Sequence, residues 1–236
     1  MCGRFTLRAP ASLIAEQFAL FDLEPFAPRF NIAPGQSLAA VRLTPGDPPG
    51  RRQLAWLRWG LIPSWAEGPS VGNRLINARS ETVLHKPAFR SAFRQRRCLV
   101  LADGFYEWQT VSGKGPKQPY FFRLRSNRAF AFAGLWESWR DAEGVTIESC
   151  TLLTTQANEL LRPIHDRMPV ILPPDAYARW LDFASDVATD LLPLLQPHPS
   201  AALTAIPVGA WINRPDHEGP QCIQPVQETQ RRLPFQ

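Results

Sequence analysis

Long apolar runs are missing from this chain of 236 residues. No run approaches the roughly 18 consecutive apolar residues that a membrane-spanning helix needs, so the sequence predicts no membrane span and no membrane partner. The start of the chain also lacks the basic segment and the apolar stretch of a secretory signal peptide. We therefore expect an intracellular, cytoplasmic protein.

Closely spaced cysteines are missing as well. The sequence has no CxxC pair and no histidine-rich segment, and its cysteines are spread along the chain: Cys2, Cys98, Cys150 and Cys222. This spacing indicates neither a zinc site nor a dense disulfide framework. We expect no metal and no organic cofactor.

Lysine is scarce, although the chain is basic. Lys and Arg together number 26 against 21 Asp and Glu, for a formal net charge of +5, but only three of these cations are lysines. The planar guanidinium of arginine can bind a phosphate through two hydrogen bonds and can stack on a base. Arginine together with 8 Trp and 14 Phe is typical of proteins that bind single strands, although most such rings lie in a core.

The residues that are present favour a mixed fold. With 44% hydrophobic residues, the chain can form one domain over residues 1–236, two small domains being the alternative. Helical spacing occurs at Pro10–Phe21, Thr155–Leu161, Asp175–Leu181 and Ser185–Leu195. Short apolar runs predict strands at Leu38–Leu43, Gln53–Trp59, Cys98–Ala102, Pro119–Leu124, Ala129–Leu135, Val145–Thr154 and Ala201–Val208. We predict an α+β fold whose mainly antiparallel strands curl into a barrel-like core, with peripheral helices.

The second residue is a cysteine, followed by a glycine. A small second residue favours removal of Met1, which would leave Cys2 with a free α-amine of pKa about 7.7–8.0 beside a thiol of pKa about 8.5. An amine and a thiol in this 1,2-relation can condense with an aldehyde, first to an imine and then to a five-membered thiazolidine. The alternative is that Cys2 is a small apolar residue at a frayed terminus.

Three further segments carry groups that could assist such a reaction. Asn77 and Arg79 lie two apart in an apolar run and so share one face of a strand, which a half-exposed edge strand would also explain. Glu107 follows a strand among aromatic residues that would raise its pKa, unless it faces solvent. His165 could transfer protons near pH 7 and Arg167 could bind phosphate, the alternative being a loop histidine beside a capping aspartate.

Other residues could contact unpaired bases. Pro34 and Trp65 lie in segments where an exposed proline and tryptophan could wedge between bases or stack on them, or could equally be turn and core residues. The basic cluster at 94–97 is most simply a solvated face, and attraction of phosphate is the alternative.

Taken in order, these segments resemble the SOS-response-associated peptidase (SRAP) family, whose members shield abasic sites in single-stranded DNA. The motifs that carry the resemblance are Met1–Phe5, Asn31–Gly35, Trp59–Pro63, Asn77–Thr82, Asp103–Trp108, His165–Pro169 and Ile223–Val226. They extend over nearly the whole chain, and the resemblance implies the SRAP-type fold.

The resemblance also implies roles for single residues in the DNA damage response. Cys2, freed of Met1, would become attached to the ring-opened C1′ aldehyde of an abasic site as a thiazolidine. Asn77 would orient the amine, Glu107 would hold it and shuttle protons, and His165 would assist opening of the deoxyribose and release of the adduct. The implied DNA contacts are Arg4, Pro34, Trp65, Arg79, Trp108 and Arg167.

The family further implies autoproteolytic removal of Met1 and a weak lyase activity, although a separate aminopeptidase could remove Met1. We expect a monomer that is nucleoid-associated when bound to DNA. Two other functions remain open: a peptidase that acts on other proteins with Cys2 and His165 as a dyad, and a non-catalytic module that binds single-stranded DNA.

Overall fold

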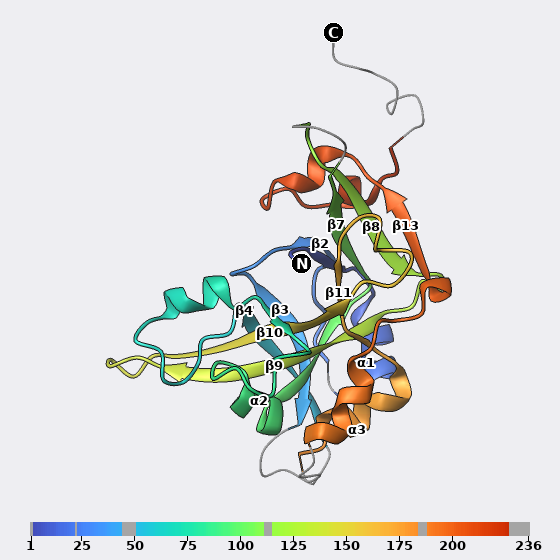
Figure 1. The fold of residues 1–236 in the computed structure, drawn as a ribbon. Helices are drawn as coiled ribbons and strands as arrows, with labels where there is room; N and C mark the ends of the chain where they lie inside the picture. Colours follow the sequence, from blue (N-terminus) through green and yellow to red (C-terminus); the bar gives the residue numbers. More distant parts are fainter. Residues whose placement is uncertain (1, 22, 44–50, 111–114, 184–187, 227–236) are drawn as a thin grey trace.

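The computed structural model describes residues 2–21, 23–43, 51–110, 115–183 and 188–226 (Figure 1). Five of its strands pair in a closed ring: β3 (Ser37–Leu43), β4 (Arg52–Trp59), β10 (Thr146–Gln156), β9 (Phe130–Arg140) and β6 (Arg97–Ala102). Only the β4–β10 pair is parallel, and the long antiparallel β9–β10 ladder closes the ring. The predicted curled, mainly antiparallel core is confirmed as a small barrel.

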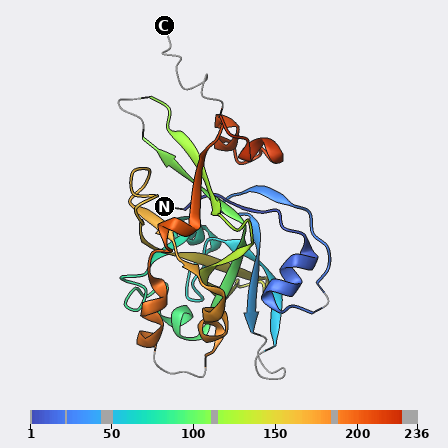
Figure 2. The ribbon, with the colours of Figure 1, turned by 90° about the vertical axis from the view of Figure 1, so that its right-hand side faces the viewer.

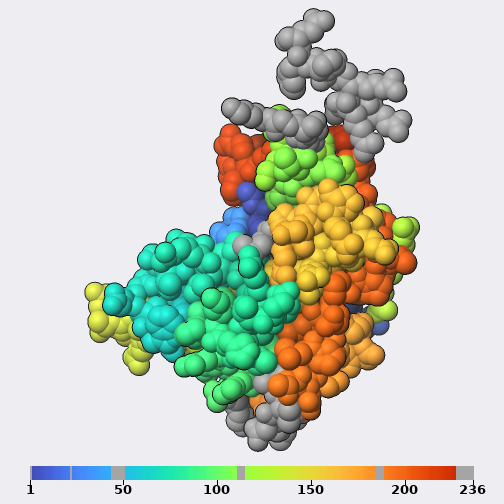
Figure 3. All heavy atoms as spheres, in the orientation of Figure 1, coloured from blue at the N-terminus to red at the C-terminus, as the bar shows by residue number. Residues whose placement is uncertain are grey.

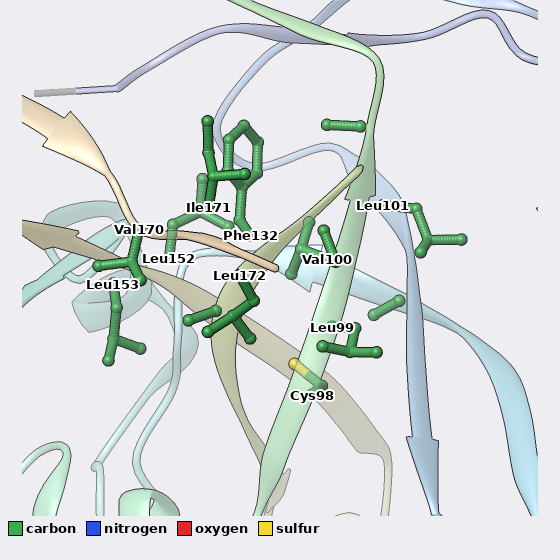
Figure 4. Close-up of a cluster of buried hydrophobic side chains, with 14 of the residues drawn as sticks. Cys98, Leu99, Val100, Leu101, Phe132, Leu152, Leu153, Val170, Ile171 and Leu172 are labelled. Atoms are coloured by element: carbon green, nitrogen blue, oxygen red, sulfur yellow. The ribbon is translucent and has the colours of Figure 1, made fainter. Parts of the chain in front are cut away.

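The barrel encloses an apolar core (Figure 4). Side chains from β6, β9 and β10 meet there, among them Val100, Phe132 and Leu152, which are all fully buried. Every residue of β6 is buried, because α3 (Tyr177–Leu181) covers its outer side and the indole Nε1 of Trp180 donates to the Cys98 carbonyl at 2.9 Å. Burial on both faces explains why this strand is a continuous apolar run in the sequence.

A second, antiparallel sheet extends beyond the barrel (Figure 1). Its order is β13 (Leu203–Pro207), β8 (Gln118–Leu124), β7 (Gly104–Gln109), β1 (Phe5–Leu7) and β2 (Arg29–Ile32). The ring of Phe5 joins this sheet to the barrel, since its centroid lies 5.1 Å from Trp59 of β4 and 5.7 Å from Phe132 of β9. The first strand of the chain therefore pairs within the second sheet and packs its Phe5 ring against the barrel.

Three short strands are added to the barrel. β5 (Asn77–Arg79) pairs in parallel with β10, β11 (Arg167–Pro169) pairs antiparallel with β10, and β12 (Ile171–Leu172) pairs antiparallel with β9. The pairing of β5 and β11 with β10 brings Asn77 and Arg167 to the same edge of the barrel.

The helices are short and lie around the barrel, as the two views of Figures 1 and 2 agree. They are α1 (Ala11–Phe18), α2 (Arg90–Gln95) and α3, with 3-10 segments η1 (Pro69–Arg74), η2 (Pro174–Ala176), η3 (Ala188–Leu195), η4 (Ser200–Ala202), η5 (Ala210–Asn213) and η6 (Pro220–Ile223). Phe18 of α1 stacks on Tyr177 of α3 at 5.3 Å. None of the helices in the described part of the chain is both long and apolar enough to span a membrane.

The seven predicted strands are all confirmed, and one predicted helix is wrong. Thr155–Leu161 does not form a helix, because β10 continues through its ladder with β11 as far as Gln156. The Asn158 side chain then accepts a hydrogen bond from the Leu161 N–H at 3.0 Å and starts a turn instead. Side-chain competition of this kind favours turns over helices.

The other three predicted helices are present in altered form. The first ends at Phe18 rather than Phe21, because Ala19 adopts a left-handed conformation with φ 54°. Asp175–Leu181 divides into η2 and α3. Ser185–Leu195 is a 3-10 helix from residue 188, and its residues 185–187 lie outside the described part.

Gly104 opens β7 where no larger residue fits. A Cβ there would lie 2.3 Å from ring atoms of Phe121 and 3.0 Å from the Phe122 carbonyl oxygen. We expect Gly104→Ala to lower the free energy of unfolding by about 1–3 kcal/mol, the usual cost of overpacking, as measured by urea titration. Gly209→Ala is the control, because nothing lies within 4 Å of its Cβ position. Equal changes in the two variants would contradict the argument.

Candidate active site around Cys2

Cys2 is held in place by the pairing of β1 with β7. Phe5 is opposite Phe105, and the Tyr106 N–H donates to the Arg4 carbonyl at 3.0 Å, so the pairing continues beyond the start of β1. Following the same register toward the N-terminus brings Cys2 alongside the segment that contains Glu107. The Cys2 side chain is completely buried, with its thiol 3.8 Å from the Arg4 carbonyl oxygen.

Asn77 reaches Cys2 from the barrel. It lies on β5 opposite Leu152 of β10, and its Nδ2 donates to the Cys2 carbonyl oxygen at 2.8 Å. Its Oδ1 is buried and has no hydrogen-bond partner in the part of the chain that the structure describes. A buried acceptor without a donor is costly, so this oxygen is available for one more hydrogen bond.

Glu107 is a buried acid on β7. Its side chain is 2% exposed, and burial raises its pKa from the ordinary 4.5 to about 7, with the negative charge of Asp166 acting in the same direction. Burial also raises the pKa of the Cys2 thiol, and the charge of Glu107 is the second cause. The two groups are therefore neighbours in an environment of low dielectric constant, where neutral forms are favoured.

His165 lies in the turn before β11. Its Nδ1 accepts a hydrogen bond from the Arg167 backbone N–H at 3.0 Å, and an Asp166 carboxylate oxygen lies equally close to the same nitrogen. Burial lowers the pKa of His165, whereas the Asp166 carboxylate, which is 86% exposed, raises it less. Burial therefore favours the neutral ring at pH 7, in which one of the two ring nitrogens carries a proton.

Two of the three predicted phosphate-binding arginines are engaged with protein groups. Arg167 binds both oxygens of Glu81, at 2.6 and 2.9 Å. Arg4 donates to the Asn31 side chain and to the Ile212 carbonyl, each at 2.8 Å. Arg79 differs from both, because it is exposed and has no side-chain hydrogen bond or ion pair in the described part of the chain.

The predicted base contacts also differ in exposure. Trp65 is 65% exposed, and Pro34 is exposed in the turn between β2 and β3. Trp108 is half-buried, and its Nε1 donates to the Asn213 side chain at 2.8 Å. Figure 3 shows a notch between the segment of η1 and the segment of η5, with N-terminal residues at its base.

The sequence alone did not single out Glu81, Asn31 or Asn213, which orient the predicted DNA-contacting side chains. Glu81 and Asn31 lie inside recognised motifs, but Asn213 lies in a segment without a distinctive pattern, 105 positions after Trp108. Among the described residues, no group of three or more His, Cys, Asp or Glu side chains could hold a metal ion.

The sequence model of the family described as SOS response associated peptidase (SRAP) matches residues 1–215. The chain therefore belongs to the SRAP family. The abasic site processing protein YoqW of Bacillus subtilis is 40% identical to it over 227 residues, which cover 95% of this chain and 99% of YoqW.

More distant similarity is also found. The abasic site processing protein HMCES of Xenopus tropicalis is 34% identical over 241 residues, covering 90% of this chain and 70% of HMCES. The crystal structure of a protein from Bacteroides thetaiotaomicron matches with a TM-score of 0.80 at 22% identity, over 96% of this chain and all of that one. This last match supports the fold alone, and it agrees with the predicted SRAP-type architecture.

The raised pKa of Glu107 makes stability depend on pH. Between pH 4.5 and about 7 the folded state keeps a proton that the unfolded state has lost, so the free energy of unfolding falls as pH rises through this window. A shift of this size corresponds to about 3 kcal/mol. Glu107→Gln removes this titration, so urea unfolding should show wild type losing about 3 kcal/mol relative to the variant between these limits. If the difference in unfolding free energy between wild type and Glu107→Gln does not change with pH, the pKa of Glu107 is not raised.

Proposed function

We propose that this protein recognises abasic sites in single-stranded DNA and becomes covalently attached to them through Cys2 once Met1 has been removed. The observation that carries the proposal is the convergence of Asn77 and Glu107 on a buried cysteine at position 2. The names of YoqW and HMCES, both abasic site processing proteins, support the same substrate.

Removal of Met1 would convert the Cys2 nitrogen from an amide into a primary amine. An α-amine has a pKa of about 7.7–8.0, so a useful fraction is neutral and nucleophilic at cellular pH. The buried Asn77 Oδ1, which has no donor in the described chain, would accept one N–H of this amine. The lone pair on nitrogen is then free to attack the C1′ carbonyl carbon.

Formation of the imine requires proton transfers that Glu107 suits. Attack by the amine gives a carbinolamine, and loss of its hydroxyl group as water needs a proton donor. With a pKa of about 7, the Glu107 carboxyl is present in both forms near neutral pH and can accept the proton from nitrogen and deliver one to the leaving hydroxyl. One water molecule leaves, and a C=N bond replaces the C=O bond.

Ring closure then forms the thiazolidine. The pKa of the Cys2 thiol is raised, so the thiol keeps its proton until its sulfur bonds to the imine carbon. The S–H proton passes to the nitrogen as the C–S bond forms, so no further molecule is lost. The imine stage is also the point at which a weak lyase reaction could cleave the strand.

His165 would act on the sugar before this condensation. An abasic deoxyribose is mostly a closed hemiacetal, and its opening requires a proton on the ring oxygen. The neutral imidazole of His165 carries one ring proton and could donate it there. In the reverse direction the same group would assist release of the adduct.

For DNA binding we propose Arg79 as a phosphate contact and Trp65 and Pro34 as base contacts, because these side chains are exposed. Base–aromatic stacking contributes about 1–3 kcal/mol per base and favours strands whose bases are unpaired. Trp108, Arg4 and Arg167 complete the proposed contacts beside the lesion. Arg4 adds positive potential there, whereas Glu81 balances the charge of Arg167.

A cysteine peptidase that acts on other proteins is a weaker reading of the site. Such an enzyme needs a thiolate, which is generated by lowering the thiol pKa. Burial and the nearby Glu107 both raise it at Cys2. We restrict any peptidase activity in this proposal to the removal of Met1.

Cys2 substitutions test the covalent step. Cys2→Ala should abolish the heat-stable adduct with an abasic oligonucleotide while leaving single-strand affinity within about twofold, because the small buried side chain makes no DNA contact in this proposal. Cys2→Ser should still form an imine that borohydride traps, but no thiazolidine. Denaturing gels and mass spectrometry of the intact protein distinguish these products. An undiminished yield of adduct with Cys2→Ala would refute the proposal.

Glu107→Gln tests the proton shuttle. General acid–base catalysis contributes about 10²–10⁴-fold, so adduct formation should slow by that factor with binding unchanged. The wild-type rate should show an ionisation near pH 7 that the variant lacks. Glu159→Gln, which replaces an exposed acid, is the matched control. Equal rates for Glu107→Gln and wild type would rule out the assigned role.

A further inference from the structure

A row of cations lies on the surface that leads from β5 to α2. Lys86, Arg90 and Arg94 are spaced four residues apart, and the Arg90 N–H donates to the Lys86 carbonyl at 2.9 Å, which extends the helical spacing ahead of α2. The three side chains therefore share a face. All three are exposed, and none has a side-chain hydrogen bond or ion pair in the described chain.

The neighbouring arginines serve the fold instead. Arg96 pairs with Glu137 at 2.7 Å, and Arg97 is buried, where it donates to the carbonyl oxygens of Phe93 and Trp180. Within the basic cluster at 94–97, Arg96 and Arg97 therefore bind protein groups, and Arg94 remains available to a binding partner. Like charges four residues apart repel one another, so a row without an intervening acid indicates an anionic partner.

Arg90 and Arg94 line one of two neighbouring cavities, whereas Lys86 lines neither. One has a volume of about 480 Å³ and is lined by Arg90, Arg94 and Ser91 together with Leu84 and His85. The other, of about 460 Å³, shares Leu84 and His85. Because they share these two lining residues, the cavities are neighbours, and we name the pair the α2 groove.

The second cavity is lined by residues next to two of the proposed DNA contacts. Its lining includes Ser80, which follows Arg79, and Glu81, which holds Arg167. Leucines form apolar walls on two sides, whereas Gln156 and Gln196 present amide groups. Apolar walls with a few hydrogen-bonding groups are typical of a site for a planar, polar-edged ligand such as a nucleobase.

We propose that the α2 groove binds the DNA strand beyond the abasic site, with its phosphates on Lys86, Arg90 and Arg94 and an unpaired base in the cavity walled by Leu84 and Leu195. The identity of the strand rests on the proposed function. Arg90 and Arg94 are about 6 Å apart along the axis of α2, a spacing comparable with that of successive phosphates in a strand. A single strand suits the groove better than a duplex, since only an unpaired base can enter the cavity.

The salt dependence of binding tests the phosphate contacts. Affinity for an undamaged single strand is measured by fluorescence anisotropy over a range of salt concentrations, for wild type and for Arg90→Gln/Arg94→Gln. Each phosphate contact in a single strand makes the slope of log K against log salt more negative by about 0.7. The slope of the variant, which lacks two contacts, should therefore be less steep by about 1.4. Arg90→Glu/Arg94→Glu should weaken binding further.

The control variant is Arg123→Gln/Arg128→Gln, which removes the same charge from β8 and the turn after it. Neither arginine has a side-chain hydrogen bond or ion pair in the described chain, and neither lines the α2 groove. The slope should stay at the wild-type value in this control. Equal slopes for the groove variant and the control would overturn the proposal.

The base site is tested by replacing one nucleotide at a time with a spacer that lacks a base. A spacer at one position beyond the lesion should lower the affinity of the strand about fivefold, which corresponds to the lower end of the range for base stacking. Loss at no position, or equal loss at all positions, would overturn the cavity's role. If Arg90→Gln/Arg94→Gln weakens binding only of duplex DNA or of an acidic peptide, the single-strand assignment is wrong.

Adduct formation on a short abasic oligonucleotide separates this proposal from the proposed function. Because the groove is reached only by the strand beyond the lesion, groove variants should form adduct on a short oligonucleotide at the wild-type rate. If wild type forms no adduct, the proposed chemistry is refuted. If the Arg90→Gln/Arg94→Gln variant nevertheless shows the expected change in the salt dependence of binding, the α2 groove remains supported as a nucleic-acid site.

Discussion

The burial of a single aromatic ring near the start of the chain organises the rest of the molecule. Phe5 packs against Trp59 and Phe132 of the barrel while its backbone pairs in the second sheet. The indole Nε1 of Trp59 in turn donates to the Ile76 carbonyl at 2.9 Å, directly before Asn77. The strand that presents the cysteine and the strand that presents the amide are thus fixed against each other through one aromatic cluster.

Burial also sets the protonation states around Cys2. The same loss of solvent raises the pKa values of a thiol and a carboxyl and lowers that of an imidazole, so near pH 7 the thiol and the imidazole are neutral and the carboxyl is partly protonated. In water, Glu107 would be ionised and would act only as a base. Enclosure between two sheets gives it access to both forms, which proton transfer in both directions requires.

The barrel and most of its strands were predictable, because each strand is a short apolar run bounded by turn-forming residues. The helix expected at Thr155–Leu161 was not, since helical spacing of apolar residues cannot compete with the β11 ladder and the Asn158 turn. Cys2, Asn77, Glu107 and His165 were predicted as site residues by residue type and motif. The partners of the arginines were not, because Glu81 and Arg167 are 86 positions apart and only the fold brings them together.

The parallel pairing of β4 with β10 has a consequence for when the site can exist. Trp59 is opposite Cys150, so the barrel cannot close on a nascent chain until about 90 further residues have left the ribosome, which takes roughly 5–20 s. Asn77 is aligned by the same late strand, and His165 follows it. Any trimming of Met1 by the protein's own side chains therefore comes after synthesis of most of the chain, whereas a cellular aminopeptidase meets the exposed terminus first.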